Sequence, residues 1–260
     1  FKSPEQRRYV GKEDIQITDL DDILQGQATF GADIRLDGMK FASVERCPVL
    51  GGKVKSFDAD AAMAVPGVEK VIELPGYAPP HAFQALGGVA VVGSSTWATF
   101  EGRKKLNVQW DLGANATYDT TAYEATLRES VRNPGRVIRE AGDVDAAMAA
   151  SPDSHEAEYF VPHLAHAPME PPVATAHTTA DGCTVWAPTQ DPQAAQTTVA
   201  ETLGMDPSQV AINVTLLGGG FGRKSKPDYL AEAALISRAI EAPAQVAWSR
   251  EDDVRHDYYH

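Results

Sequence analysis

The chain has 260 residues, 43% of them hydrophobic and 23% charged, with 21 glycines and 17 prolines. This composition is typical of a folded protein with many turns, and the length predicts one large unit or two smaller domains. Lys and Arg total 23 against 36 Asp and Glu, so the formal net charge is -13. Because this charge repels the phosphates that dominate nucleic-acid affinity, the composition argues against a nucleic-acid partner.

The cysteines and the hydropathy of the chain argue against an iron-sulfur cluster and a membrane-spanning helix in this chain. The chain has only Cys47 and Cys183, with no CxxC pair, whereas an iron-sulfur cluster needs about four protein ligands. Any such cluster must belong to a partner. We expect both cysteines to be buried free thiols. A disulfide between them is the alternative, although their spacing gives it no support. No apolar run approaches the roughly 18 residues of a membrane-spanning helix, and Phe1–Pro4 does not begin a signal peptide, so we expect a soluble chain.

The first half of the chain predicts β structure followed by two β-α-β units. Residues 28–44 carry extended apolar residues broken by glycine turns, as strands do. Residues 54–74 combine a strand, a helix and a second strand, and residues 87–110 repeat this order. A cluster of cations at 103–105 lies at the end of the second helix, where we expect a solvated helix terminus.

The second half follows a stretch at 113–142 that is rich in Asn, Thr, Gly and charge around a short helix at 121–131, which is typical of a connection between domains. The dipeptide Asp181-Gly182 predicts a hairpin. Because strands and helices alternate without the regular spacing of a doubly wound sheet, the predicted fold class is α+β. The expected elements are a helix at 143–150, strands at 154–161, 173–179 and 183–187, a helix at 194–203, a strand at 210–216, a helix at 228–240 and a strand at 245–248.

The most distinctive local pattern is the glycine loop LGGGFGR at 217–223, between a β-rich run and a helix. Glycines adopt positive φ, and successive N–H groups can then converge on an anionic or oxo oxygen. The pattern is neither the GxGxxG of a dinucleotide fold nor a phosphate-binding GxxxxGK[ST] loop, and it is also compatible with a simple tight turn. Phe221 favours a ligand, because a large apolar ring must pack against the core or a bound ring system.

Two further segments carry polar groups that allow more than one interpretation. Gln190 could donate an amide hydrogen bond to a ligand oxygen or could cap the following helix, and the residues alone favour capping. His163, His166 and Glu170 crowd a proline-restricted loop. Zinc ligands with this spacing usually lie on a helix, which prolines forbid, so satisfied polar residues are favoured over a metal site. A hydrolytic triad is set aside because no GxSxG elbow is present.

Taken together, the ordered motifs resemble the molybdenum-binding subunit of the xanthine dehydrogenase family, in particular its isoquinoline 1-oxidoreductase and bacterial aldehyde dehydrogenase branch. The motifs that carry the resemblance are AHAPMEP at 165–171, VWAPTQDPQ at 185–193, LLGGGFGRK at 216–224 and WSREDD at 248–253.

The first half resembles the aldehyde oxidase hammerhead domain of the same family, through GQATFGADIRLDGM at 26–39 and the two β-α-β stretches. The resemblance covers nearly the whole chain. It divides the chain into a hammerhead-like domain at 1–112, a connecting segment at 113–142 and the first part of a molybdopterin-binding domain at 143–260.

The resemblance implies a molybdopterin cofactor, in its cytosine dinucleotide form, that carries molybdenum. It implies that Gln190 hydrogen-bonds an oxo ligand of the metal and that the backbone of Phe221 and Gly222 lies against the metal centre. Because the pterin dithiolene holds the metal, no protein ligand to it is required. The cofactor-binding residues that the resemblance implies are Gln190, Gly219, Gly220, Phe221, Gly222 and Arg223.

The family oxidises an aldehyde or an N-heteroaromatic compound with water-derived oxygen, assisted by a glutamate from a later Gly-Glu motif. No such motif occurs in this chain. We therefore expect part of a subunit, inactive alone, that assembles with the rest of the molybdenum subunit, a separate [2Fe-2S] subunit and, as a further option, a cytochrome c. Periplasmic placement is implied, with the cytoplasm as the alternative.

Ser225 follows Lys224 where the purine-oxidising branch has a substrate-binding glutamate, so an aldehyde or simple azaarene is favoured over a purine. The rival interpretation is a non-catalytic interaction or scaffolding module that keeps the fold without the cofactor, and the missing glutamate favours it. Molybdenum and pterin analysis of the assembled protein separates the two.

Overall fold

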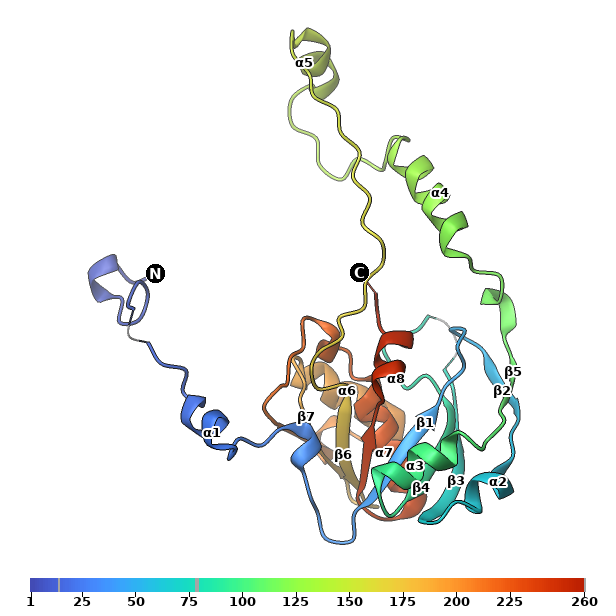
Figure 1. The fold of residues 1–260 in the computed structure, drawn as a ribbon. Coiled ribbons are helices and arrows are strands. Elements are labelled where there is room, and N and C mark those ends of the chain that lie inside the picture. Colours follow the sequence, from blue (N-terminus) through green and yellow to red (C-terminus); the bar gives the residue numbers. More distant parts are fainter. Residues whose placement is uncertain (14, 78–79, 260) are drawn as a thin grey trace.

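The computed structural model describes residues 1–13, 15–77 and 80–259. Within them, a seven-stranded sheet in the order β3-β4-β1-β9-β6-β7-β8 forms the body of the molecule (Figure 1). The strands are β1 (Lys40–Glu45), β2 (Lys53–Ser56), β3 (Val68–Leu74), β4 (Gly88–Gly93), β5 (Gln109–Asp111), β6 (Val173–Thr178), β7 (Cys183–Ala187), β8 (Val210–Val214) and β9 (Ala244–Ala247). The α-helices are α1 (Leu20–Gln25), α2 (Ala59–Met63), α3 (Thr96–Arg103), α4 (Thr120–Val131), α5 (Val144–Ala150), α6 (Pro192–Leu203), α7 (Asp228–Ile240) and α8 (Arg250–Arg255).

The strands and helices of the two expected β-α-β units form, but their strands pair differently from that prediction. β3 pairs antiparallel with β4 in the main sheet, whereas β2 pairs antiparallel with β5 in a separate two-stranded sheet. The two units are therefore interleaved, and the two strands of each unit lie in different sheets. An apolar pattern specifies that a segment is a strand, but it does not specify the partner of that strand.

The main sheet is covered on both faces. Successive side chains of a strand point to opposite faces, so Val89 and Val91 of β4 pack in the cluster beneath α2 and α3. Ala90 and Val92 join the larger core under α6 and α7. This double burial explains the continuous apolar run of β4, because a strand that is buried on both faces has no polar side.

The sheet continues across the predicted division of the chain, because β1 pairs in parallel with β9. A buried ion pair also joins the two predicted parts of the chain. The guanidinium of Arg46, just after β1, donates to the carboxylate of Glu232 on α7 at 2.7 and 2.6 Å. Trp248 Nε1 donates to the same carboxylate at 3.0 Å, and Arg46 Cζ lies 3.9 Å from the centroid of the Trp248 ring. The division at 113–142 thus remains a prediction about the sequence.

Arg103 corrects the expectation of a solvated helix end. Its side chain is only 14% exposed and contacts Asp252 at 2.7 Å and Glu45 at 3.1 Å. Lys104 does match the expectation, since it is exposed and pairs within its own helix with Glu101. Composition marks a cationic helix end, but it cannot show that the distant α8 brings a carboxylate to it.

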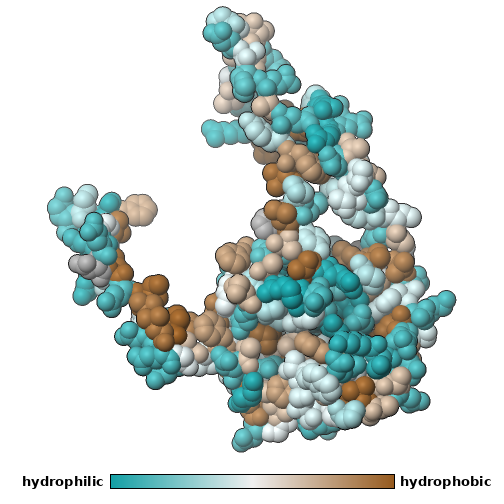
Figure 2. Space-filling model, in the orientation of Figure 1, coloured by the Kyte–Doolittle hydropathy of each residue, from teal (hydrophilic) through white to brown (hydrophobic). Residues whose placement is uncertain are grey.

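Two segments project from the body (Figure 1). Residues 112–164 leave it after β5 and carry α4 and α5, both predicted and capped by Asp119 and Asp143. The strand predicted at 154–161 does not form, because this exposed stretch has no neighbouring strand to pair with. The N-terminal arm is equally exposed, and Figure 2 shows hydrophobic residues gathered on it, where Ile15, Ile17 and Leu24 are exposed.

The cysteines are both free, as predicted. Cys183 is buried, whereas Cys47 is only partly buried, and burial raises the pKa of both thiols above the ordinary value. None of the helices in the described ranges is long and apolar enough to cross a membrane.

The buried contact between Arg46 and Glu232 gives a test of the fold. Glu232→Ala should lower the free energy of unfolding by about 3–5 kcal/mol, because it leaves a buried guanidinium without its carboxylate. The double variant Arg46→Met with Glu232→Leu should recover most of this loss. Urea unfolding followed by circular dichroism measures both, and a loss below about 1 kcal/mol in the single variant would contradict the described core.

Candidate functional site

Strand direction brings the distinctive motifs of the sequence to one edge of the sheet. β7 and β8 are parallel, so the segments that follow them begin at the same edge. β6 runs antiparallel to both β7 and β9, so the residues before β6 meet those after β7 and β9. Four segments therefore start or end at this edge: AHAPMEP at 165–171, WAPTQDPQ at 186–193, the glycine loop at 217–223 and WSREDD at 248–253.

The glycine loop and Gln190 are in direct contact. Gln190 Oε1 accepts a hydrogen bond from the backbone N–H of Gly222 at 3.1 Å, and Gln190 N donates to Lys224 O at 3.0 Å. A Cβ added at Gly220 would lie 2.6 Å from Gln190 Oε1, so only glycine permits this approach. Since the amide oxygen faces Gly222, the amide NH₂ group points away from it and has no hydrogen-bond partner within the described residues.

Gln190 is not the helix cap that the residues alone favoured. The cap of α6 is Asp191, whose carboxylate accepts from Ala194 N at 3.0 Å. Gln190 instead contacts the glycine loop, which leaves its amide nitrogen available to a ligand.

The loop backbone is strained and partly unpaired. Gly219 and Gly222 have φ of +90° and +106°, and Phe221 has a φ of +52°, which is uncommon for a residue with a side chain. Gly222 and Arg223 use their N–H groups within the site, but those of Gly219, Gly220 and Phe221 make no hydrogen bond to any described residue. Successive unpaired N–H groups are the backbone feature that binds oxygen anions.

Phe221 does not pack against the core of this chain. Its side chain is 70% exposed, in contrast to the alternative of core packing. The ring is presented at the surface beside Gly219, whose added Cβ would lie 3.1 Å from Phe221 Cε2. Packing of Phe221 against the core of this chain was therefore wrong as an alternative, and a bound ring system stays a prediction.

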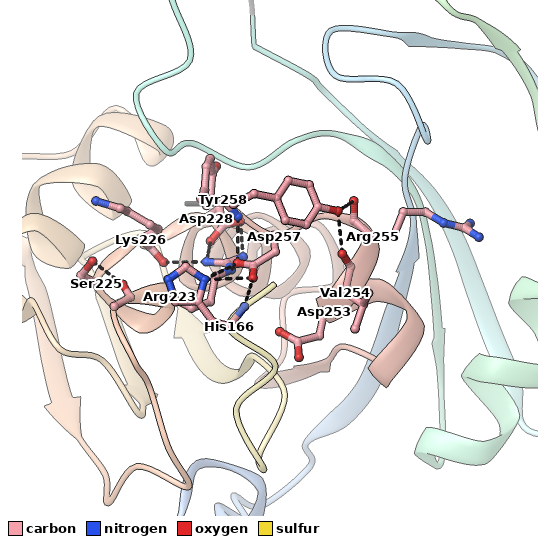
Figure 3. A network of polar contacts seen from close by, with 12 residues as sticks. His166, Arg223, Ser225, Lys226, Asp228, Asp253, Val254, Arg255, Asp257 and Tyr258 are labelled. Carbon is pink, nitrogen blue, oxygen red and sulfur yellow. Dashed lines mark hydrogen bonds and ion pairs between the residues drawn. The ribbon is translucent and has the colours of Figure 1, made fainter. Parts of the chain in front are cut away.

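Arg223 anchors the loop from inside the protein (Figure 3). Its guanidinium donates to both oxygens of Asp228, at 2.9 and 2.8 Å, and Nε lies 3.2 Å from Asp257 Oδ1. Burial lowers the pKa of Arg223, but the negative charge of Asp228, with a smaller effect from Asp257, outweighs it and raises the pKa above its ordinary value. Because the side chain is fully buried and paired, the guanidinium is not available to a ligand.

Lys224 anchors the loop on its other side. Its buried ammonium group donates to Glu170 at 2.8 Å, and burial lowers its pKa while Glu170 opposes that shift. Glu170 also accepts from Ala32 N at 3.2 Å and from Gly218 N at 3.4 Å. One carboxylate thus joins the glycine loop, the loop before β6 and the N-terminal segment.

The cluster of His163, His166 and Glu170 is not arranged as a metal site. His166 Nδ1 lies 2.9 Å from Asp257 Oδ2, Glu170 pairs with Lys224, and the His163 ring stacks on Tyr123 at 5.7 Å. No group of three metal-binding side chains is found in the described part of the chain. The interpretation as satisfied polar residues is confirmed for His166 and Glu170.

Two contributors to the site carry no signal in the sequence. Asp257, just beyond WSREDD, holds both His166 and Arg223, and no local pattern sets it apart from its acidic neighbours. The sequence assigns residues 29–32 only to the first half, yet Leu216 N donates to Thr29 O at 3.2 Å. A Cβ on Gly31 would lie 2.5 Å from Pro188 Cδ, and this close packing explains the glycine.

Residues 128–259 match the family profile of the molybdopterin cofactor-binding domain. Among curated proteins, the chain is 35% identical over 258 residues to the beta chain of isoquinoline 1-oxidoreductase from Brevundimonas diminuta, covering 95% of this chain and 32% of that protein. It is 27% identical to a nicotinate dehydrogenase chain of Pseudomonas putida, covering 97% of this chain and 21% of that protein. The chain therefore spans about a third or less of the length of these relatives.

Solved structures share the fold. Aldehyde oxidoreductase from Desulfovibrio gigas superposes with a TM-score of 0.74 at 18% identity, over 94% of this chain and 31% of that one. Quinoline 2-oxidoreductase from Pseudomonas putida 86 gives a TM-score of 0.70 at 22% identity, over 92% of this chain and 34% of that one. With the profile match over half of the chain, these findings confirm the resemblance and the α+β fold class, and the protein belongs to the molybdopterin cofactor-binding domain family.

Proposed function

We propose that this chain is part of a molybdenum hydroxylase that oxidises an aldehyde or an N-heteroaromatic compound with water-derived oxygen. The observation that carries the proposal is the contact of Gln190 Oε1 with Gly222 N, which leaves the Gln190 amide nitrogen without a partner among the described residues, beside three unpaired backbone N–H groups. The names of the relatives support the substrate classes.

The residues present fit a molybdopterin cofactor. A Cβ at Gly220 would fill the space against Gln190, the N–H groups of Gly219 to Phe221 are unpaired within the described ranges, and the exposed Phe221 ring offers an apolar face. The site thus offers hydrogen-bond donors and an apolar surface, and the described residues contain no cluster of protein metal ligands. Such a site suits a metal that is held by its own organic ligand.

When bound, the cofactor supplies the two-electron redox chemistry. Gln190 and the N–H groups of the loop would hold it and would donate hydrogen bonds to its oxygen atoms, which stabilises negative charge there. The ion pairs of Arg223 and Lys224 keep these donors in place, so little reorganisation is required. Phe221 would shield the site from water.

Substrate preference and partners extend the same proposal. Ser225 donates its hydroxyl to Gly222 O at 2.6 Å, so this position closes the loop and offers no carboxylate to a purine. The catalytic glutamate would come from the rest of the molybdenum subunit, and electrons would pass to a separate [2Fe-2S] subunit, with a cytochrome c as a further option. The cytosine dinucleotide form of the cofactor and a periplasmic location belong to this proposal by family resemblance.

Gln190→Ala tests the hydrogen-bond donor in the assembled enzyme. We expect kcat to fall about a hundredfold, because one preorganised donor to developing negative charge is lost. The thermal midpoint should stay nearly unchanged, since Gln190 is exposed. Gln193→Ala is the matched control, because Gln193 is also exposed and its side chain hydrogen-bonds within α6. Equal kcat in the two variants would argue against the assigned role.

Gly220→Val tests cofactor seating. Its side chain would meet Gln190 Oε1, so the loop must shift, and we expect molybdenum and pterin content to fall at least about tenfold per folded complex. Gly135→Val is the control, because a Cβ there meets no atom within 4 Å. Inductively coupled plasma mass spectrometry measures the metal, and full molybdenum content in Gly220→Val would refute the site.

A further inference from the structure

One buried carboxylate, that of Asp257, joins two loops of the candidate site. In Figure 3 it contacts His166, in the loop before β6, and Arg223, the last residue of the glycine loop. Its Oδ2 accepts from the backbone N–H of His166 at 2.5 Å and lies 2.9 Å from His166 Nδ1. Its Oδ1 lies 3.2 Å from Arg223 Nε and accepts from Tyr258 N at 2.8 Å. The side chain of Asp257 is fully buried, so water does not compete for these contacts.

The two loops are strained next to the residues that Asp257 holds. Ala167, which follows His166, has a φ of +42°, and Gly222, which precedes Arg223, has a φ of +106°. The side chain of Ala167 makes its conformation costly, and such a backbone persists only where neighbouring contacts fix it. The contacts of Asp257 are therefore placed where they can hold both turns.

The imidazole of His166 extends from Asp257 to the glycine loop. Its Nδ1 faces the carboxylate, and the opposite edge of the ring lies against Gly222. A Cβ added at Gly222 would lie 3.3 Å from His166 Nε2 and 3.7 Å from Cδ2. Gly222 is the residue whose N–H donates to Gln190 Oε1. A shift of the ring would therefore move the donor that orients the Gln190 amide.

The contacts of Asp257 require a carboxylate. Each of its partners is a donor, because a carboxylate can only accept hydrogen bonds. The donors reach both oxygens, His166 at one and Arg223 at the other. The amide of an asparagine has only one oxygen, and its NH₂ group donates. Asp257→Asn would therefore leave either His166 or Arg223 facing a second donor.

We propose that Asp257 is a positioning residue of the cofactor site. Through the His166 ring it fixes Gly222, and Gly222 in turn holds Gln190 in the orientation that presents its amide nitrogen. Arg223 is held by the same carboxylate, so one group controls the end of the glycine loop. This inference rests on the proposed function, because the group that Gln190 faces is the proposed cofactor.

Hydrogen–deuterium exchange of the Gly222 amide tests the proposal in the assembled protein, prepared without cofactor. Asp257→Asn should speed this exchange at least about tenfold, because loss of a charge-assisted hydrogen bond lets the loop open more often. His166→Asn should speed it as well, because the new amide nitrogen can keep the contact with Asp257 while the ring edge against Gly222 is lost. Mass spectrometry with electron-transfer fragmentation resolves the single amide.

Asp252→Asn is the matched control. Asp252 is also a buried carboxylate, on α8, but it pairs with Arg103 at 2.7 Å. Its substitution should lower the free energy of unfolding and leave exchange at Gly222 unchanged. If Asp257→Asn does not fold, His166→Asn carries the test, because it keeps the carboxylate of Asp257 paired.

Turnover gives a second measurement that a purely structural role would not move. In the complex loaded with cofactor, kcat per bound molybdenum should fall about tenfold in Asp257→Asn with KM unchanged, because the misplaced donor serves the transition state. A raised KM at constant kcat would overturn the proposal.

Unchanged exchange at Gly222 in His166→Asn, or in folded Asp257→Asn, would also overturn it, as would an equal rise in Asp252→Asn. Wild-type protein that assembles without molybdenum would instead refute the proposed function. The exchange result would stand in that case, because it requires no cofactor.

Discussion

The direction of four neighbouring strands is the constraint on which the site depends. Because β7, β8 and β9 run one way and β6 runs the other, the loops that bear chemistry emerge at one edge of the sheet. Residues separated by more than 80 positions meet there, as when Arg250 Nη2 donates to Pro168 O. Gln190 follows β7 and the glycine loop follows β8, so a change in the register or direction of either strand would separate them.

The backbone of the glycine loop is strained, and buried ion pairs around it hold it in this conformation. A positive φ at Phe221, a residue with a side chain, costs free energy. Arg223 and Lys224 directly follow the strained segment, and each is buried in an ion pair with a carboxylate from a different part of the chain. Strained backbone persists only where the surrounding structure fixes it, and such positions cluster at ligand-binding sites.

Much of the fold could be predicted from the sequence, since α7 at 228–240 and the hairpin of β6 and β7 follow from periodicity and from Asp181-Gly182. The loop at 217–223 stands out because so many glycines in one turn favour a close approach to a ligand. Strand partners were not predictable, which explains the interleaved β2 and β5, because apolar alternation is the same for any partner. The roles of Asp257 and Arg103 depend on contacts between distant segments, and local spacing carries no signal for them.

The central claim is that the amide of Gln190 and the main chain of Gly219 to Phe221 bind the same cofactor. A crystal structure of the assembled protein loaded with molybdenum cofactor tests it most directly. We predict that Gln190 Nε2 lies about 3 Å from an oxygen atom of the cofactor, with the loop backbone in contact with the same group. A cofactor bound elsewhere, with Gln190 facing solvent, would contradict the account.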